Sequence, residues 1–311
     1  MIQAEKLRAA AGGAVLENEP MSQHTTFRAG GPADYFVTPA DEQALAAVIA
    51  CCREAGEPYY LIGNGSNILV ADSGYRGVII RMGQGMGEIR SLPGNILRAG
   101  AGALLSVIAK EARDRSLAGF AFAAGIPGSL GGACVMNAGA YGGEMKQVLR
   151  TVRVLAPEGD FLDLPADELD LGYRHSNIPE RGYTAVRADI QLEPGNRAEI
   201  GAMMDDLAGR RREKQPLEYP SAGSTFKRPE GYFAGKLIQD AGLRGFRVGG
   251  AQVSEKHCGF VINRDHASSA DIYRLIREVQ ARVFADSGVR LEPEVKFLGF
   301  AEDAEDQRAE S

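Results

Sequence analysis

Glycine is concentrated in one segment of this chain, residues 125–144 (GIPGSLGGACVMNAGAYGGE), where seven of twenty residues are glycine and one is charged. Each glycine in a helix or strand costs conformational entropy, so a dense run favours sharp turns and close approach of the backbone to a ligand. Backbone N–H groups in such turns form concave sites that bind phosphate. A shorter run, residues 63–67 (GNGSN), follows an apolar segment. Two such loops in one chain indicate a ligand with a pyrophosphate.

Composition excludes several classes of protein. The 311 residues are 44% hydrophobic and 24% charged, as in ordinary globular proteins, and the net charge of −6 argues against a nucleic-acid partner. The N-terminus has no apolar signal region and no run of eighteen apolar residues occurs, so we expect neither secretion nor a membrane partner. Four cysteines without CxxC spacing fit reduced thiols, and His257, Cys258 and His266 match no zinc pattern. We therefore expect a cytoplasmic protein without a metal.

Helix and strand patterns alternate along the chain. Helices are predicted at residues 41–56 and 103–117, and strands at 59–62, 78–81, 96–99, 151–155, 161–164 and 184–192. A polar segment at 193–197 is predicted as a linker. Beyond it, helices are predicted at 198–214, 231–241 and 269–286, and strands at 259–263 and 289–297. The acidic tail from residue 301 lacks apolar periodicity and is predicted to be disordered.

The helix predicted at 198–214 carries an apolar face and a basic end. Ile200, Met203, Met204 and Leu207 share the apolar face. Arg210, Arg211, Arg212 and Lys214 fall in its last turns, where the helix dipole favours positive charge. We interpret this basic cluster as a solvated helix end.

Alternation in the predicted strand at 289–297 places carboxylates on one face. Val289, Leu291, Val295 and Phe297 share one parity, and Arg290, Glu292, Glu294 and Lys296 share the other. A charged solvent face explains this pattern without any function. Pro293 indicates an edge or interrupted strand, where a functional side chain can be aimed. Strand parity does not distinguish Glu292 from Glu294.

Two further loops combine turn residues with chemically useful side chains. Residues 172–177 place Arg174 among turn formers, and residues 219–227 place Ser224 directly after a glycine. No G-x-S-x-G nucleophile elbow is present, although Ser224 can still serve as a proton donor. From spacing alone, loop structure explains both segments. The P-loop motif is absent and the Rossmann fingerprint is matched only imperfectly, so a dinucleotide is held in another way.

Six ordered motifs between residues 21 and 300 together resemble one family. They are residues 24–28 (HTTFR), 63–67 (GNGSN), 125–129 (GIPGS) with 137–142 (NAGAYG), 173–176 (YRHS), 222–227 (AGSTFK) and 291–295 (LEPEV). This series resembles the UDP-N-acetylenolpyruvoylglucosamine reductases, oxidoreductases of bacterial peptidoglycan precursor synthesis. The resemblance implies an α+β fold in which two subdomains of the vanillyl-alcohol oxidase and p-cresol methylhydroxylase type clamp FAD, followed by an α+β substrate-binding domain.

The resemblance also implies a domain division and a set of cofactor contacts. The expected domains are 1–195 for FAD (subdomains about 1–80 and 81–195), 196–300 for substrate, and the tail 301–311. FAD is expected to bind non-covalently, with NADPH as co-substrate. The expected FAD contacts are Gly63, Asn64, Gly65, Ser66, Asn67, Gly125, Ile126, Pro127, Gly128, Ser129, Asn137, Ala138, Gly139, Tyr141 and Gly142.

Carried over residue by residue, the resemblance implies three catalytic residues. Hydride passes from FAD N5 to C3 of the enolpyruvyl ether, and negative charge develops at C2 and the carboxylate. Arg174 is expected to stabilise that charge, Ser224 to protonate C2, and Glu294 to steady the intermediate or its proton network. The expected product is UDP-N-acetylmuramate, the expected partner is the UDP-sugar substrate, and the protein is expected to be a monomer or weak homo-oligomer.

Two departures from the family pattern affect the substrate site. Residues 187–197 are too short for the insertion with a Tyr-bearing loop that some members have, so the chain resembles the compact second type. Arg228 stands where other members have Asn, and Lys227, Arg228 and Lys236 are expected to supply charge to the UDP diphosphate. Two alternatives stay open: another oxidoreductase on the same flavin fold, or a non-catalytic sensor that binds FAD or a UDP-sugar.

Overall fold

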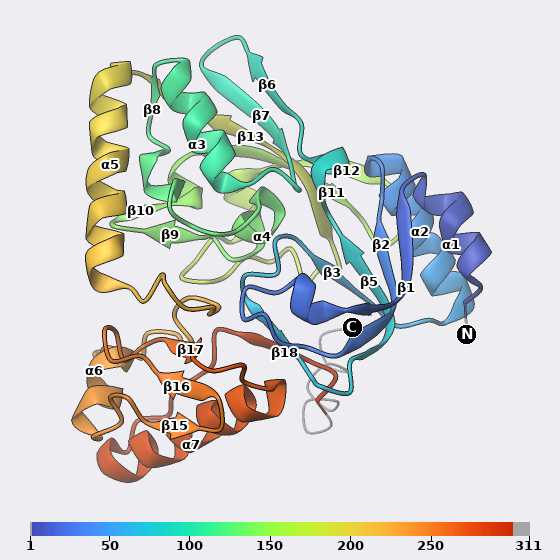
Figure 1. Cartoon of the computed structure of the whole chain (residues 1–311). Helices are drawn as coiled ribbons and strands as arrows, with labels where there is room; N and C mark the ends of the chain where they lie inside the picture. Colours follow the sequence, from blue (N-terminus) through green and yellow to red (C-terminus); the bar gives the residue numbers. More distant parts are fainter. Residues whose placement is uncertain (1, 301–311) are drawn as a thin grey trace.

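The computed structural model describes residues 2–300 and packs them into three groups of helices and strands (Figure 1). The predicted acidic tail at residues 301–311 lies outside the described residues. Within the described range, no helix combines the length and apolar content needed to cross a membrane. The four cysteines are all free thiols.

The first group is a four-stranded sheet covered by two helices. Its elements are α1 (Ala4–Ala11), β1 (Ala14–Pro20), β2 (Pro32–Thr38), α2 (Glu42–Ala55), β3 (Tyr59–Ile62) and β5 (Tyr75–Arg81). The strand order is β1-β2-β5-β3, with β1 antiparallel to β2 and the other pairs parallel. The α2 helix begins where Asp41 Oδ1 accepts a hydrogen bond from Ala44 N at 2.8 Å, and it ends at Gly56 with φ +62°, as the sequence predicts.

Strand alternation gives the first sheet two buried faces. Val78 and Ile80 of β5 pack with Leu45 of α2, while Ile79 between them packs on the other face with Met21. The sheet is therefore a central layer, and the loops at the ends of its strands are held in place from both sides.

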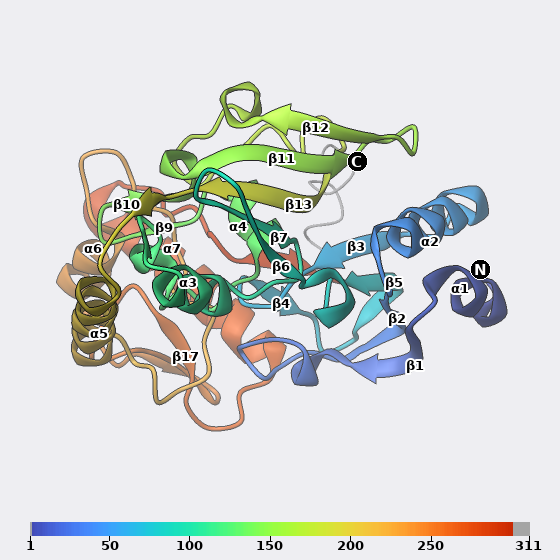
Figure 2. The same cartoon turned by 90° about the horizontal axis from the view of Figure 1, so that it is seen from above.

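The second group is a five-stranded antiparallel sheet with two helices on its inner face. Its elements are β6 (Ile89–Leu92), β7 (Ile96–Gly100), α3 (Leu105–Asp114), α4 (Leu130–Val135), β11 (Leu149–Leu155), β12 (Phe161–Pro165) and β13 (Thr184–Gln191). The order is β12-β11-β13-β7-β6. Ile108 of α3 and Leu130 of α4 are fully buried against this sheet. Figure 2 shows α1 and α2 at the opposite end of the molecule from the long helix α5 (Arg197–Lys214).

The third group is a small antiparallel sheet packed on one long helix. Its elements are α6 (Ala234–Asp240), β15 (Arg247–Val248), β16 (Ala251–Val253), β17 (Val261–Asn263) and α7 (Ser269–Ser287). The α7 helix starts with a capping box, in which Ser268 Oγ accepts from Asp271 N and Ser268 N donates to the Asp271 carboxylate.

Short elements complete the described chain. They are β4 (Ile68–Val70), β8 (Leu117–Ala118), β9 (Gly139–Ala140), β10 (Gly143–Glu144), β14 (Glu193–Pro194), β18 (Lys296–Leu298) and the 3₁₀ turns η1 (Met21–Gln23), η2 (Gln84–Met86), η3 (Ala121–Ala123), η4 (Met145–Gln147) and η5 (Ala166–Leu169). The last strand, β18, returns to the first group and pairs in parallel with β4.

The third group is joined to the first by hydrogen bonds as well as by apolar packing. Asp72 accepts hydrogen bonds from the first two amides of α7, Ser269 N at 2.8 Å and Ala270 N at 2.9 Å. Asn263 Nδ2 donates to the Phe27 carbonyl at 2.9 Å, and the fully buried Phe27 ring belongs to the core of the third group. The two groups therefore share one core and one helix cap.

Two predicted elements differ from the structure. Residues 193–197, predicted as a linker, form β14 against β8 and then the start of α5, which lies against α3, η3 and β8. Of the predicted apolar face of α5, only Ile200 is buried, and Met203 is 58% exposed. The predicted strand at 289–297 is regular only in β18, because Pro293 has no amide hydrogen to extend a ladder. The division at 195/196 stays a prediction.

Replacing Asp72 by alanine removes both acceptors at the N-terminus of α7 and leaves two amides without partners. We expect the free energy of unfolding to fall by about 1–2 kcal/mol, as for the loss of a helix cap, in urea denaturation at neutral pH. Asp265→Ala, which removes an exposed carboxylate just before the same helix, is the control. Equal losses in the two variants would mean that the Asp72 hydrogen bonds do not stabilise the junction.

Candidate active site

Arg174 is presented by a tight turn in the second group. Gly172 and His175 form an isolated antiparallel bridge, so Tyr173 and Arg174 are the two residues at the tip. Arg174 has φ +54°, in the left-handed region that non-glycine residues rarely adopt. Such strain persists where surrounding contacts enforce it, and here Asn137 Nδ2 donates to the Gly172 carbonyl at 2.9 Å. The turn therefore directs the guanidinium toward Glu294.

Glu294 meets Arg174 at the point where the three groups come together. Arg174 Nε donates to Glu294 Oε1 at 2.8 Å, and the two side chains are 22% and 13% exposed. Asn67 Nδ2 donates to the Glu294 carbonyl at 3.0 Å, and Glu294 N donates to the Thr225 carbonyl at 2.8 Å. Burial raises the pKa of the Glu294 carboxyl, against the opposing effects of Arg174 and, more weakly, Lys227.

The two carboxylates that strand parity leaves equivalent have different surroundings. Glu292 is 68% exposed and pairs with Lys227 at the surface, whereas Glu294 is largely buried beside Arg174. The difference arises because the segment around Pro293 bridges to Phe226 and is not part of a flat ladder. Tertiary contacts therefore single out Glu294.

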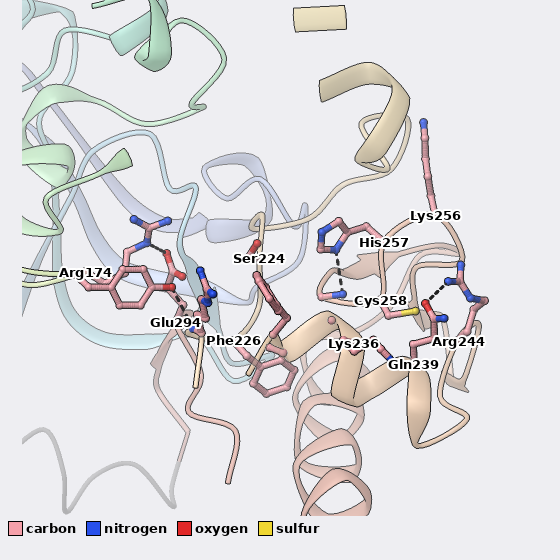
Figure 3. Close-up of a pocket in the computed structure, with 16 residues that line it drawn as sticks. Arg174, Ser224, Phe226, Lys236, Gln239, Arg244, Lys256, His257, Cys258 and Glu294 are labelled. Atoms are coloured by element: carbon pink, nitrogen blue, oxygen red, sulfur yellow. Dashed lines mark hydrogen bonds and ion pairs between the residues drawn. The ribbon is translucent and has the colours of Figure 1, made fainter. Parts of the chain in front are cut away.

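Ser224 lies across a pocket from the Arg174–Glu294 ion pair. Gly223 before it has φ +76°, a backbone conformation that suits glycine, and the Ser224 side chain is exposed to the pocket. The cavity has a volume of about 390 Å³ and is lined by all three predicted catalytic residues. Figure 3 shows Ser224 between the ion pair on one side and His257 with Cys258 on the other. This arrangement places a hydroxyl donor and a cation on one cavity.

The two glycine loops predicted to hold FAD contact each other. Asn64 Nδ2 donates to the Pro127 carbonyl at 2.7 Å, and a Cβ on Gly63 would lie 1.9 Å from Ser129 Oγ. Gly65 has φ +62°, and a Cβ there would lie 1.9 Å from the His24 carbonyl oxygen. Only glycine fits at both positions.

Buried hydroxyls at these loops fit a phosphate-bearing cofactor. Ser129 Oγ and Thr26 Oγ1 are buried and have no hydrogen-bond partner in the described part of the chain, although buried hydroxyls are normally paired. Thr26 N donates to the Gly65 carbonyl at 3.1 Å, so Thr26 belongs to the same cradle. Unsatisfied donors beside two glycine turns are what the pyrophosphate of FAD requires, so these residues fit the predicted cofactor.

The remaining predicted cofactor residues follow α4. Asn137 is 1% exposed, and its side chain is occupied by Glu144, Gly172 and the amide of Lys146, so it braces the Arg174 turn. Tyr141, at the hairpin between β9 and β10, is 46% exposed with φ +54°. Ala138 precedes β9, Gly139 begins it and Gly142 lies in the turn before β10. Ile126, Gly128 and Ser66 lie in the two loops.

Of the three predicted basic residues, two line the pocket. Arg228 stacks on the Phe233 ring with its Cζ 4.0 Å from the centroid, and Lys236 pairs with Asp240 at 2.6 Å. Lys227 pairs with the exposed Glu292 and is not among the residues that line the cavity. Arg228 has no carboxylate partner within residues 2–300, which leaves its charge free for a ligand.

Several residues that line the pocket were not predicted from the sequence. Gln239, Arg244, Lys256, His257 and Cys258 line the end of the cavity away from Arg174 (Figure 3). Burial lowers the pKa of His257, and its Nδ1 accepts from Gly259 N at 3.1 Å. In the sequence, His257 and Cys258 stand out only because they were considered as metal ligands and matched no zinc pattern. Their position depends on close packing of Gly235 against Gly259, which spacing does not reveal.

Two family models match this chain. Residues 33–165 match an FAD binding domain, and residues 215–298 match the C-terminal domain of UDP-N-acetylenolpyruvoylglucosamine reductase. The α+β fold with an FAD-binding domain is therefore confirmed.

Individual proteins are similar over nearly the whole chain. The UDP-N-acetylenolpyruvoylglucosamine reductase of Agathobacter rectalis is 53% identical over 92% of this chain and 94% of its own length. That of Clostridioides difficile is 52% identical over 91% and 92%. The crystal structure of UDP-N-acetylenolpyruvylglucosamine reductase from Thermus caldophilus matches with a TM-score of 0.78 at 34% identity, over 92% of this chain and 98% of that chain.

Replacing Arg174 by glutamine removes the main charge that lowers the pKa of Glu294, so this pKa rises further. A folded-state pKa above the unfolded value means that the folded state holds more protons between the two values, so stability falls as pH rises through that window. We expect the Arg174→Gln protein to lose stability over a wider pH range than the wild type in urea titrations from about pH 4 to pH 8.

The same pKa can be followed directly by ¹³C NMR of the carboxyl, with Glu294→Gln identifying the signal. Lys236→Gln is the control, because Lys236 lines the pocket but is not among the groups that shift this pKa. A Glu294 titration that is the same with and without Arg174 would contradict the assigned electrostatics.

Proposed function

The chain belongs to the UDP-N-acetylenolpyruvoylglucosamine reductase family, and we propose that it reduces the enolpyruvyl ether of UDP-N-acetylglucosamine enolpyruvate to UDP-N-acetylmuramate. The enzyme is an FAD-dependent oxidoreductase of peptidoglycan precursor synthesis, with NADPH as co-substrate. The observation that carries this function is that Ser224 and the Arg174–Glu294 pair line one cavity. FAD, when bound, would supply the hydride chemistry, by which a hydride that originates from NADPH is added at C3 of the enolpyruvyl group.

Arg174 stabilises the negative charge that develops at C2 and the carboxylate of the substrate. Its Nε donates to Glu294, and this hydrogen bond fixes the orientation of the guanidinium and of its two terminal nitrogens. A cation placed where charge develops, in a partly desolvated site, lowers the barrier more than it would in water. The left-handed turn at Arg174 therefore contributes to catalysis through orientation.

Ser224 donates the proton that C2 needs after hydride addition at C3. A serine hydroxyl is a weak acid, so its contribution rests on position and on the cation nearby. Exposure of Ser224 to the cavity leaves the hydroxyl free to face a ligand. Glu294 keeps Arg174 in place and provides an acceptor for the proton network around the intermediate.

FAD would be held by the two glycine loops and the hairpin after α4. Backbone groups of residues 63–67 and 125–129, with the hydroxyls of Ser129 and Thr26, are the donors for its pyrophosphate. Asn137 would support the Arg174 turn and would not bind FAD through its side chain, because that side chain is already hydrogen-bonded within the protein. The contacts are all non-covalent.

The diphosphate of the UDP-sugar would bind at the basic rim of the cavity. Arg228 and Lys236 line this rim, and Arg244 and Lys256 extend it, so the cavity carries four cations beyond Arg174. Lys227 acts on the site indirectly: it pairs with Glu292, and its positive charge lowers the pKa of Glu294. We further propose that the protein works in the cytoplasm, where this precursor pathway runs, as a monomer or weak homo-oligomer.

Replacing Ser224 by alanine should separate the two half-reactions. NADPH should still bleach the flavin spectrum at the wild-type rate, whereas reoxidation by the enolpyruvyl UDP-sugar should slow by about 10²- to 10⁴-fold. Anaerobic stopped-flow absorbance measures both steps on one sample. Ser221→Ala, in the same loop, should leave both steps unchanged. Full turnover in the Ser224→Ala protein would remove Ser224 as the proton donor.

Replacing Arg228 by alanine removes the basic pocket residue without a carboxylate partner. We expect KM for the UDP-sugar to rise by about tenfold, with KM for NADPH unchanged, because one charge-assisted contact is lost. Lys227→Ala should have a smaller effect, since its charge is already paired with Glu292. Equal changes in KM for the two substrates would argue against a diphosphate contact at Arg228.

A further inference from the structure

Arg211 differs from the other basic residues at the end of α5. Arg210 is exposed and pairs with Asp206 at 2.8 Å, and Lys214 is also exposed, so the prediction of a solvated helix end suits them. Arg211 is half-buried and has no carboxylate partner within residues 2–300. Burial lowers the pKa of its guanidinium, and the phenol of Tyr141 opposes this effect.

The Arg211 side chain packs directly on the first residue of the second glycine loop. A Cβ placed on Gly125 would lie 3.1 Å from both Cδ and Nη1 of Arg211. The other end of this loop carries Ser129, whose buried hydroxyl has no partner in the described chain. One loop therefore has a cation against its start and an unsatisfied donor at its end.

An arginine stays charged at all physiological pH values, and a desolvated guanidinium without a counter-ion is costly. Arg211 is only half-buried, and an anion with several acceptor oxygens suits a guanidinium, which offers five donors in a planar fork. Arg211 is not among the residues that line the substrate cavity. Its surroundings are the loop and the hairpin that the proposed function assigns to the cofactor.

We propose that Arg211 binds the pyrophosphate of the dinucleotide cofactor, from a helix outside the region that the FAD-binding family model matches. The inference rests on the proposed function, because the pyrophosphate is that of FAD. It gives α5 a role in the cofactor site. The helix would couple cofactor binding to the third group, since Lys256 Nζ donates to the backbone carbonyl of the next residue, Arg212, at 2.7 Å.

The test is a titration of apo-protein with FAD, followed by quenching of flavin fluorescence. Arg211→Gln should raise Kd for FAD by about 10- to 100-fold, the effect expected for a lost charge-assisted contact. Arg211→Lys should recover part of the loss, because it restores charge without the planar fork. Arg210→Gln, one residue away and solvent-exposed, should stay within about twofold of wild type.

A second titration separates the two sources of pyrophosphate. UDP is added to the FAD-loaded proteins and its Kd is measured by calorimetry; we expect no change in Arg211→Gln. A rise in Kd for UDP with an unchanged Kd for FAD would overturn the assignment to the cofactor, as would an unchanged Kd for both. Failure of the wild-type protein to bind FAD would instead remove the proposed function. Thermal unfolding of the apo-proteins checks folding, and Arg211→Lys supplies the comparison should Arg211→Gln not fold.

Discussion

The ion pair between Arg174 and Glu294 is the contact on which the site depends, because Glu294 is held by all three groups of the fold. Its carboxylate accepts from Arg174 of the second group, its carbonyl accepts from Asn67 of the first, and its amide donates to Thr225 of the third. The loop of Asn67 also belongs to the predicted FAD cradle. The predicted FAD loops, Arg174 and the loop of Ser224 therefore share one fixed point.

Such a pair is better understood as a device for positioning than as a source of stability. Removing two charges from water costs free energy that their attraction only partly returns, and the raised pKa of Glu294 shows that burial has the larger effect here. The left-handed turn at Arg174 adds strain of about 1 kcal/mol or more. Both costs are concentrated at Arg174, the residue that the proposed function uses as its cation.

Local physics made much of this fold predictable. The caps of α2 and α7 follow from Asp41, Gly56 and Ser268, whose backbone preferences act within a few residues. The failures have longer-range causes: residues 193–194 became a strand because β8 is available to pair with them. The prediction of a buried apolar face on α5 was wrong, because the elements packed against the helix, and not its own periodicity, decide which of its residues are covered. At the site, strand parity left Glu292 and Glu294 equivalent and motif resemblance selected Glu294. The two carboxylates differ in burial and partner, and this difference depends on tertiary contacts.

The pairing of β18 with β4 joins residues more than two hundred positions apart, and it governs how the protein can be made. A nascent chain that has emerged through α4 already contains both cofactor loops, yet the edge at β4 has no partner until residues 296–298 leave the ribosome. Glu294 and the α7 amides that Asp72 caps also leave the ribosome long after both loops. Long-range pairing of this kind is slow, and it follows the local elements. A chain truncated before residue 294 would therefore contain both predicted FAD loops but would lack Glu294 and the partner strand of β4.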